Sequence, residues 1–191
     1  MLEKRLVELW KKYQRQMSSD KLNEILARGI CYSEVKHACP ILVTGINPSY
    51  RHGDTACNKD ISTFSYQKII RNGDDHYFHA INKLFPEYWK AKVEYLDILN
   101  FRETDQNVVW DFCKDGNGLE FVAQNLRFSQ LMIEQVIQPR LIVVKNKSSW
   151  DLWGKSATPS GNIWMGYKFE LEKSLDCGDL CRIVGLVDHP D

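Results

Sequence analysis

The segment Ile41-Leu42-Val43-Thr44-Gly45-Ile46 decides the fold. It is short, rich in β-branched residues and almost free of polar side chains, which is typical of a strand buried on both faces of a parallel sheet. The dipeptide Asn47-Pro48 ends the run, since proline cannot donate to the hydrogen-bond ladder. The sequence therefore predicts a central strand that opens at Asn47 into a polar loop.

Similar apolar runs recur on the C-terminal side of this segment, with helical patterns around them. Strands are predicted at residues 93–100, 141–144 and 182–187, with a further one near 163–169. Apolar residues at helical spacing predict helices at 2–17, 20–28, 64–70, 76–85, 121–138 and 148–153. Residues 30–40 and 49–63 are expected to be irregular. Helices that alternate with short apolar strands predict an α/β fold, a three-layer α/β/α sandwich around a mostly parallel four-stranded sheet.

Length and composition place the chain among ordinary globular proteins. Its 191 residues fit a single domain, 1–191, in which residues 1–29 form an N-terminal helical segment. The 25 basic and 25 acidic residues cancel, so no global field attracts nucleic acid or anionic lipid, and any such attraction must be local. No apolar run approaches the roughly 20 residues of a membrane helix. The six scattered cysteines are expected to be reduced, in a cytoplasmic protein without membrane contact.

Polar residues follow each predicted strand at the point where it ends. The four strand exits are 47–49, 100–102, 145–149 and 189–190. Three of them supply a carboxamide and one supplies an imidazole. Ligands of open parallel sheets bind beyond the carboxyl ends of the strands. We therefore expect a functional site where these exits meet.

The order of these motifs resembles that of the uracil-DNA glycosylase superfamily. Gly45-Ile46-Asn47-Pro48-Ser49 resembles its first motif, and most closely that of the mismatch-specific uracil/thymine and single-strand-selective branches. His189-Pro190 resembles the second motif. Leu96-Asp97-Ile98-Leu99-Asn100 is similar to the strand whose last Asn reads the base, and residues 139–148 are similar to the third strand of the superfamily. The resemblance covers the chain from about residue 41 onward.

The resemblance implies hydrolysis of the bond between a sugar and uracil or a related base in DNA. Asn47 would position the water, and His189 would donate a hydrogen bond to the departing base. Asn100 would read the base edge, next to Gly45 and Ile46. A flipped base also needs an aromatic surface to stack on. Its candidates are Phe64, Tyr66 and Phe78.

DNA, single-stranded or duplex, is the partner that the resemblance implies. Phosphate would be bound by polar and basic residues near two of the strand exits, namely Ser49, Lys145, Lys147, Ser148 and Ser149. The resemblance implies no cofactor and no metal, because the cysteine spacing differs from that of the iron–sulfur branch. We expect the protein to be monomeric.

Each of these residues also has a purely structural interpretation. Asn47 before proline is ordinary turn chemistry, Asn100 is suited to capping a turn, and Ser148-Ser149 is suited to capping a helix. His76 and His79 would share a helical face but lack a third metal ligand. Cys177 and Cys181 suit a hairpin with free thiols better than zinc, and Trp150 and Trp153 suit packing.

Two other functions remain open beside the glycosylase. One is a superfamily relative without catalytic activity that binds nucleic acid or a protein partner. The other is an α/β enzyme that acts on a small nucleoside or nucleotide. Convergence of Asn47, Asn100 and His189 on one cavity would favour the glycosylase, and their pointing into different regions would count against it.

Overall fold

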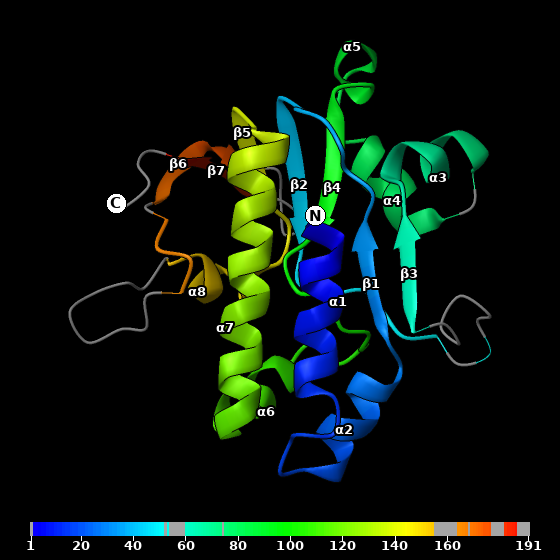
Figure 1. Cartoon of the computed structure of the whole chain (residues 1–191). Coiled ribbons are helices and arrows are strands. Elements are labelled where there is room, and N and C mark those ends of the chain that lie inside the picture. The colour runs from blue at the N-terminus through cyan, green and yellow to red at the C-terminus, as the bar shows by residue number, and fades with distance from the viewer. Residues whose placement is uncertain are drawn as a thin grey trace.

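The computed structural model describes residues 2–51, 53, 60–73, 75–154, 164–167, 169–176 and 182–186. Its centre is a sheet with the strand order β4-β2-β5-β7-β6 (Figure 1). Its strands are β2 (Ile41–Gly45), β4 (Val93–Asp97), β5 (Leu141–Val144), β6 (Phe169–Asp176) and β7 (Arg182–Leu186). The chain is an α/β protein, as the alternation of helices and apolar strands predicts.

The direction of the strands differs along the sheet. β2 pairs in parallel with β4 on one side and with β5 on the other. β7 runs antiparallel to β5, and β6 runs antiparallel to β7. Residues 177–181 alone separate β6 from β7, and this is too short for the crossover that parallel strands need. The described sheet thus has five strands where four were expected, and its parallel part is β4-β2-β5.

A second, two-stranded parallel sheet lies beside the end of β4. It pairs β1 (Ile30–Ser33) with β3 (Ile61–Phe64). The backbone N–H of Cys31 donates to the carbonyl of Asn100 over 2.9 Å, which ties β1 to the exit of β4. Both strands fall in segments that the sequence predicts to be irregular. β3 lacks an apolar signal because it is short and only half-buried.

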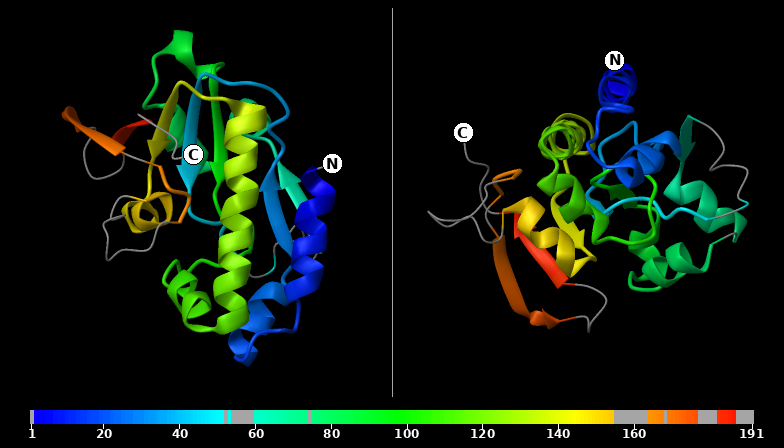
Figure 2. Two further views of the ribbon diagram at one scale, coloured as in Figure 1. Left: turned by 60° about the vertical axis from the view of Figure 1, so that its left-hand side comes forward. Right: turned by 90° about the horizontal axis from the view of Figure 1, so that it is seen from below.

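Helices lie on both sides of the parallel strands. The longest is α7 (Gly116–Leu131), which lies alongside α1 (Leu2–Tyr13) on one side, whereas α3 (Tyr66–Asn72) and α4 (His76–Asn82) lie on the other (Figures 1 and 2). The remaining helical segments are α2 (Asp20–Ala27), α5 (Glu87–Lys90), α6 (Val108–Lys114), η2 (Met132–Ile137), η3 (Lys147–Ser149) and α8 (Trp150–Trp153).

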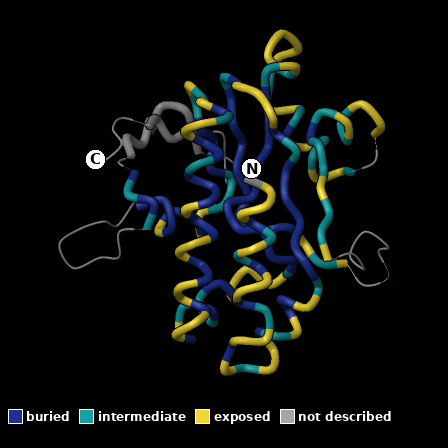
Figure 3. Tube along the Cα trace, viewed as in Figure 1, coloured by how far each residue is buried: buried dark blue, intermediate teal, exposed yellow. Residues whose placement is uncertain are grey.

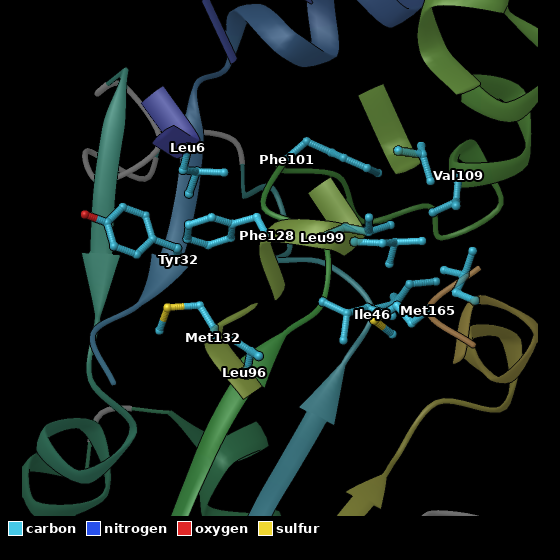
Figure 4. Packing of buried hydrophobic residues seen from close by; sticks show 14 of the residues in the cluster. Leu6, Tyr32, Ile46, Leu96, Leu99, Phe101, Val109, Phe128, Met132 and Met165 are labelled. Atoms are coloured by element: carbon cyan, nitrogen blue, oxygen red, sulfur yellow. The ribbon is translucent and has the colours of Figure 1, made fainter. Parts of the chain in front are cut away.

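Alternate side chains of β2 and β4 belong to two separate hydrophobic cores. β2 and β4 are buried along their whole length (Figure 3). Leu96 belongs to the larger core, in which it lies near Phe128 and Met132 from the α7–η2 side (Figure 4). Val43 and Tyr95 belong to the smaller core, with Tyr66 of α3. Both faces of the parallel strands are therefore covered.

The long helix predicted at residues 121–138 is present but differs at both ends. It begins at Gly116, because the Asp115 side chain accepts a hydrogen bond from the Gly118 N–H over 2.9 Å and caps it. Its last part, η2, is a π-helix that ends at Gln138, which has a left-handed backbone with φ 47°. Helix α6, just before it, was not predicted.

Candidate functional site

A cavity of about 380 Å³ lies at the carboxyl ends of β2 and β4, beside the exit of β5. We call it the strand-end cavity. It combines apolar, amide, acidic and basic side chains from six parts of the chain. Its lining is Cys31, Ile46, Asn47, Pro48, Ser49, Arg51, Ser62, Thr63, Phe64, Ile69, Asp75, Tyr77, Phe78, Tyr95, Asp97, Arg102, Gln106 and Asn146.

Hydrogen bonds hold the three strand exits together at this cavity. The Glu103 N–H donates to the Pro48 carbonyl over 3.0 Å, which joins the exits of β4 and β2. The Asn146 amide donates to the Gln106 side chain over 2.6 Å, which joins the exits of β5 and β4. Three of the four predicted exits therefore meet at one edge of the sheet.

Asn47 is held in one orientation by backbone carbonyls. Its Nδ2 donates to the carbonyl of Glu103 over 2.6 Å and to that of Pro48 over 3.2 Å. These two bonds fix the amide group through its nitrogen. Asn47 is 8 % exposed, and its Oδ1 is buried without a hydrogen-bond partner among the described residues. A buried acceptor without a partner costs free energy unless a water or ligand occupies it.

Gly45 leaves room for a tyrosine and a carboxyl group of the neighbouring strand. It is the register partner of Asp97, and an added Cβ would overlap the Tyr95 hydroxyl and the Asp97 carboxylate. The Tyr95 hydroxyl donates to Asp97 Oδ1 over 2.8 Å and lies 3.2 Å from the Tyr77 hydroxyl. Gly45 therefore supports the site by lacking a side chain, and Ile46 is a lining residue.

Burial raises the pKa values of Asp97, Tyr77 and Tyr95. The complete burial of Asp97 raises the pKa of its carboxyl to about 7, and the hydrogen bond from Tyr95 acts in the opposite direction. Burial also raises the pKa of Tyr77 to about 12 and that of Tyr95 well above its ordinary value, so both hydroxyls stay protonated. Asp97 thus changes charge near neutral pH at the inner end of the cavity.

Two of the three aromatic candidates line the strand-end cavity. The Phe64 and Phe78 ring centroids lie 5.7 Å apart at an interplanar angle of 33°. Phe78 also meets the Tyr95 ring edge-on at 4.9 Å. Tyr66, by contrast, is fully buried in the smaller core and does not belong to the lining. Phe64 and Phe78 provide an apolar wall for a flat ligand.

Charged residues of both signs surround the cavity. Arg51 forms an ion pair with Asp75 at 3.2 Å, and Asp75 also caps the start of α4 by accepting from the Tyr77 N–H. Arg102 is buried and bonds to Ser62. The Lys145 ammonium lies 3.4 Å from the centre of the Tyr77 ring. Positive charge is therefore present locally, although the chain is neutral overall.

Asn100 does not reach the strand-end cavity, contrary to the expectation that it reads a ligand there. Its Nδ2 and its backbone N–H both donate to Oδ1 of Asn125 on α7, over 2.9 and 3.1 Å. Asn100 is 1 % exposed and has the same parity as Leu96, whose side chain enters the larger core. Its bonds to Asn125 direct it towards α7, and it is not among the residues that line the cavity.

The predicted phosphate-binding turn is partly closed by its own hydrogen bonds. The Asn146 side chain accepts from the Ser148 N–H over 3.0 Å, and Ser149 is buried with its hydroxyl donating to the Asn146 carbonyl over 2.7 Å. Ser149 is thus a structural residue. Ser49, Lys147 and Ser148 are exposed to solvent. The following residues Trp150 and Trp153 are buried in the larger core, as packing predicts.

His189 lies outside the described residues, as do Cys177 and Cys181. The strand before His189 is β7, and its antiparallel pairing with β5 puts Arg182 beside Val144 and Val184 beside Ile142. Leu186 therefore ends β7 at the opposite edge of the sheet from Asn47. The antiparallel direction of β7 was not predicted, because an apolar run does not encode strand direction.

Asp97, Tyr95 and Tyr77 form the part of the site that the sequence did not reveal. A signal for two of them was present, since Tyr95 and Asp97 have the same parity in a buried strand. Tyr77 could not be identified from the sequence, because it lies on α4 and comes close to Tyr95 only in the folded chain.

Comparisons with known proteins find no matching family model, no matching curated protein and no matching solved structure. Within the described residues, no three or more His, Cys, Asp or Glu side chains are grouped so that they could hold a metal ion. Nor does any helix of the described chain have the length and apolar character needed to cross a membrane. The cysteines described, Cys31, Cys39 and Cys113, are free thiols.

Proposed function

We propose that the strand-end cavity binds a nucleobase and that the protein is a DNA glycosylase of the uracil-DNA glycosylase type, built as a three-layer α/β/α domain. The observation that carries this proposal is the carboxamide of Asn47, which is held through Nδ2 by two backbone carbonyls and lines a cavity with an aromatic wall. The parallel strand order β4-β2-β5, with the Gly45-Ile46-Asn47-Pro48 turn at its centre, supports it.

The reaction breaks the bond between C1′ of the sugar and a ring nitrogen of the base. The base departs with the electron pair, and a water adds its oxygen to C1′ and releases a proton. Asn47 Oδ1 would accept a hydrogen bond from this water and hold its oxygen towards C1′. A carboxamide is too weak a base to remove the proton, so Asn47 contributes orientation.

The base needs an apolar surface and a positive environment as it leaves. Phe64 and Phe78 would stack on a flipped base. The buried cation of Arg102 would stabilise the negative charge that builds up on the base. The exposed Ser49, Lys147 and Ser148 would contact backbone phosphates.

Excision from uracil-containing oligonucleotides tests the proposal. Single- and double-stranded substrates are incubated with the protein, treated with alkali and resolved by length. We expect nicks at uracil, and a loss of about 100-fold or more in rate for Asn47→Ala. Asn117→Ala is the matched control, because this exposed carboxamide bonds to the Gln16 carbonyl and lies outside the cavity lining.

Two outcomes would replace the proposal. DNA binding without nicks at any base would indicate a relative that binds nucleic acid without cleaving it. Binding of free nucleosides without binding of oligonucleotides would indicate an enzyme of small nucleosides or nucleotides.

A further inference from the structure

The strand-end cavity has an inner and an outer polar group on neighbouring strands. Asp97 is level with Gly45, the last paired residue of β2. Asn47 follows Gly45 by two residues, beyond the end of β2, and both Asn47 and Asp97 line the cavity. A base whose sugar lies beside Asn47 would present its Watson–Crick edge to Asp97.

Asp97 has an oxygen available for such an edge. Its Oδ1 accepts from Tyr95, and within the described chain no hydrogen bond or ion pair occupies its Oδ2. Phe78 packs edge-on against the Tyr95 ring, so the carboxyl group lies next to the aromatic wall. Asn100, which was expected to read the base, is occupied by Asn125 on the other face.

We infer that Asp97 reads the base edge, and that its protonated form selects bases that present an N–H donor beside a carbonyl acceptor, as uracil and thymine do. The inference rests on the proposed function of the cavity. A protonated Oδ2 would donate to the carbonyl of the base, and Oδ1, which accepts from Tyr95 with one lone pair, would accept from the base N–H with its other. A carboxylate offers acceptors alone, and the carbonyl oxygen of the base would then face a negative charge.

Burial makes this choice depend on pH near neutrality, because it raises the pKa of Asp97 to about 7. The titratable groups that face Asp97 are Tyr95 on its own strand and Tyr77 on α4. Other charged groups of the lining are Asp75 at the start of α4, Arg51 after β2 and Arg102 after β4. Lys145, after β5, lies over the Tyr77 ring.

Equilibrium binding of oligonucleotides between pH 5.5 and 8.0 tests the inference. One single-stranded probe carries a uracil nucleotide with a 2′-fluoro-arabino sugar, which resists cleavage, and the other carries a tetrahydrofuran in place of that nucleotide. The ratio of their affinities measures base recognition alone. For the wild type we expect this ratio to fall by about tenfold per pH unit above the pKa of Asp97.

Asp97→Asn is the decisive variant, since an amide of the same shape keeps a donor and an acceptor at every pH. We expect its ratio to be constant from pH 5.5 to 8.0 and to exceed that of the wild type at pH 8.0. Asp75→Asn is the matched control, because asparagine also caps a helix, and its pH profile should keep the wild-type midpoint.

The outcomes separate the inference from the proposed function. If the wild type discriminates the two probes and Asn47→Ala abolishes this, but Asp97→Asn keeps the wild-type pH profile, the inference alone is overturned. A wild-type ratio that does not change with pH also overturns it. If the wild type binds both probes equally at every pH, the proposed function and the inference fail together.

Discussion

Two buried polar residues at the end of β4 have different surroundings. On the side towards α7, three residues beyond the strand, Asn100 is enclosed and two of its N–H groups bond to Asn125. On the face towards α4, Asp97 bonds through one oxygen to Tyr95 and lines a cavity with the other available. Both residues are almost fully buried. The two residues thus differ in what surrounds them, a side chain of α7 for Asn100 and a cavity for Asp97, although Oδ1 of Asn100 also has no partner among the described residues.

The largest expected effect concerns Asp97 and the pH dependence of folding. The unfolded carboxyl ionises near 3.8 and the folded one near 7. Below pH 3.8 both states are protonated and stability is not reduced. Between these values only the unfolded state loses its proton, so the free energy of unfolding falls as pH rises. Relative to Asp97→Asn, the wild type should lose about 4 kcal/mol between pH 4 and 8.

Urea unfolding of both proteins at each pH measures this difference. The buried Glu94, whose pKa is also raised by burial, is present in both proteins and cancels. Parallel stability curves for the two proteins would show that Asp97 is not the buried titrating group of the cavity face.

The next effect concerns the space that Gly45 leaves for the cavity face. Gly45→Ala places a methyl group against Tyr95 and Asp97, and we expect the free energy of unfolding to fall by about 3 kcal/mol. Gly116→Ala is the matched control, because its added Cβ has no neighbour within 4 Å and alanine favours a helix. Equal stability of the two variants in urea would contradict the close approach at Gly45.

A smaller effect separates the two faces directly. Asn125→Ala removes the acceptor of two buried N–H groups of Asn100 and should cost about 2 kcal/mol of stability. Asn47→Ala should cost about 1 kcal/mol, since it also removes an oxygen that has no partner. Thermal or urea unfolding compares them. A larger cost for Asn47→Ala would contradict the assignment of Asn125 to the stability of the fold and of Asn47 to the cavity.

The smallest effect concerns the exposed lysine near the cavity. Lys147→Ala should weaken single-stranded DNA binding modestly and lower the slope of log affinity against log salt concentration by up to about 1. Lys11→Ala, on the exposed side of α1, serves as the control and should leave the slope unchanged. The same slope for wild type and Lys147→Ala would remove Lys147 from the DNA contact.

The parts of the fold that the sequence predicted are those with a strong local signal. β2 and β5 are apolar runs and were predicted almost to the residue. β1 and β3 were missed because their pairing involves residues about 30 positions apart and a polar segment. The antiparallel direction of β7 was missed for a different reason, since hydrophobicity alone does not encode strand direction.

The candidate site was predictable where it follows directly from a strand exit. Asn47, Ser49, Phe64 and Phe78 line the cavity as residues chosen from the sequence. Asn100 was assigned to the wrong face because its partner, Asn125, comes from a helix that lies 25 residues further along the chain. Asp97 was overlooked because the role of a carboxyl group in a buried strand depends on its neighbours in the folded chain, which the sequence does not show.

The central claim is that the cavity face of β4 receives a nucleobase. The most direct test is the affinity of the wild type at pH 6 for the two oligonucleotides that differ in one base, the uncleavable uracil probe and its tetrahydrofuran counterpart. The account predicts that the base raises affinity at least about tenfold and that Asn47→Ala abolishes this gain. Equal affinity of the wild type for both oligonucleotides would contradict it.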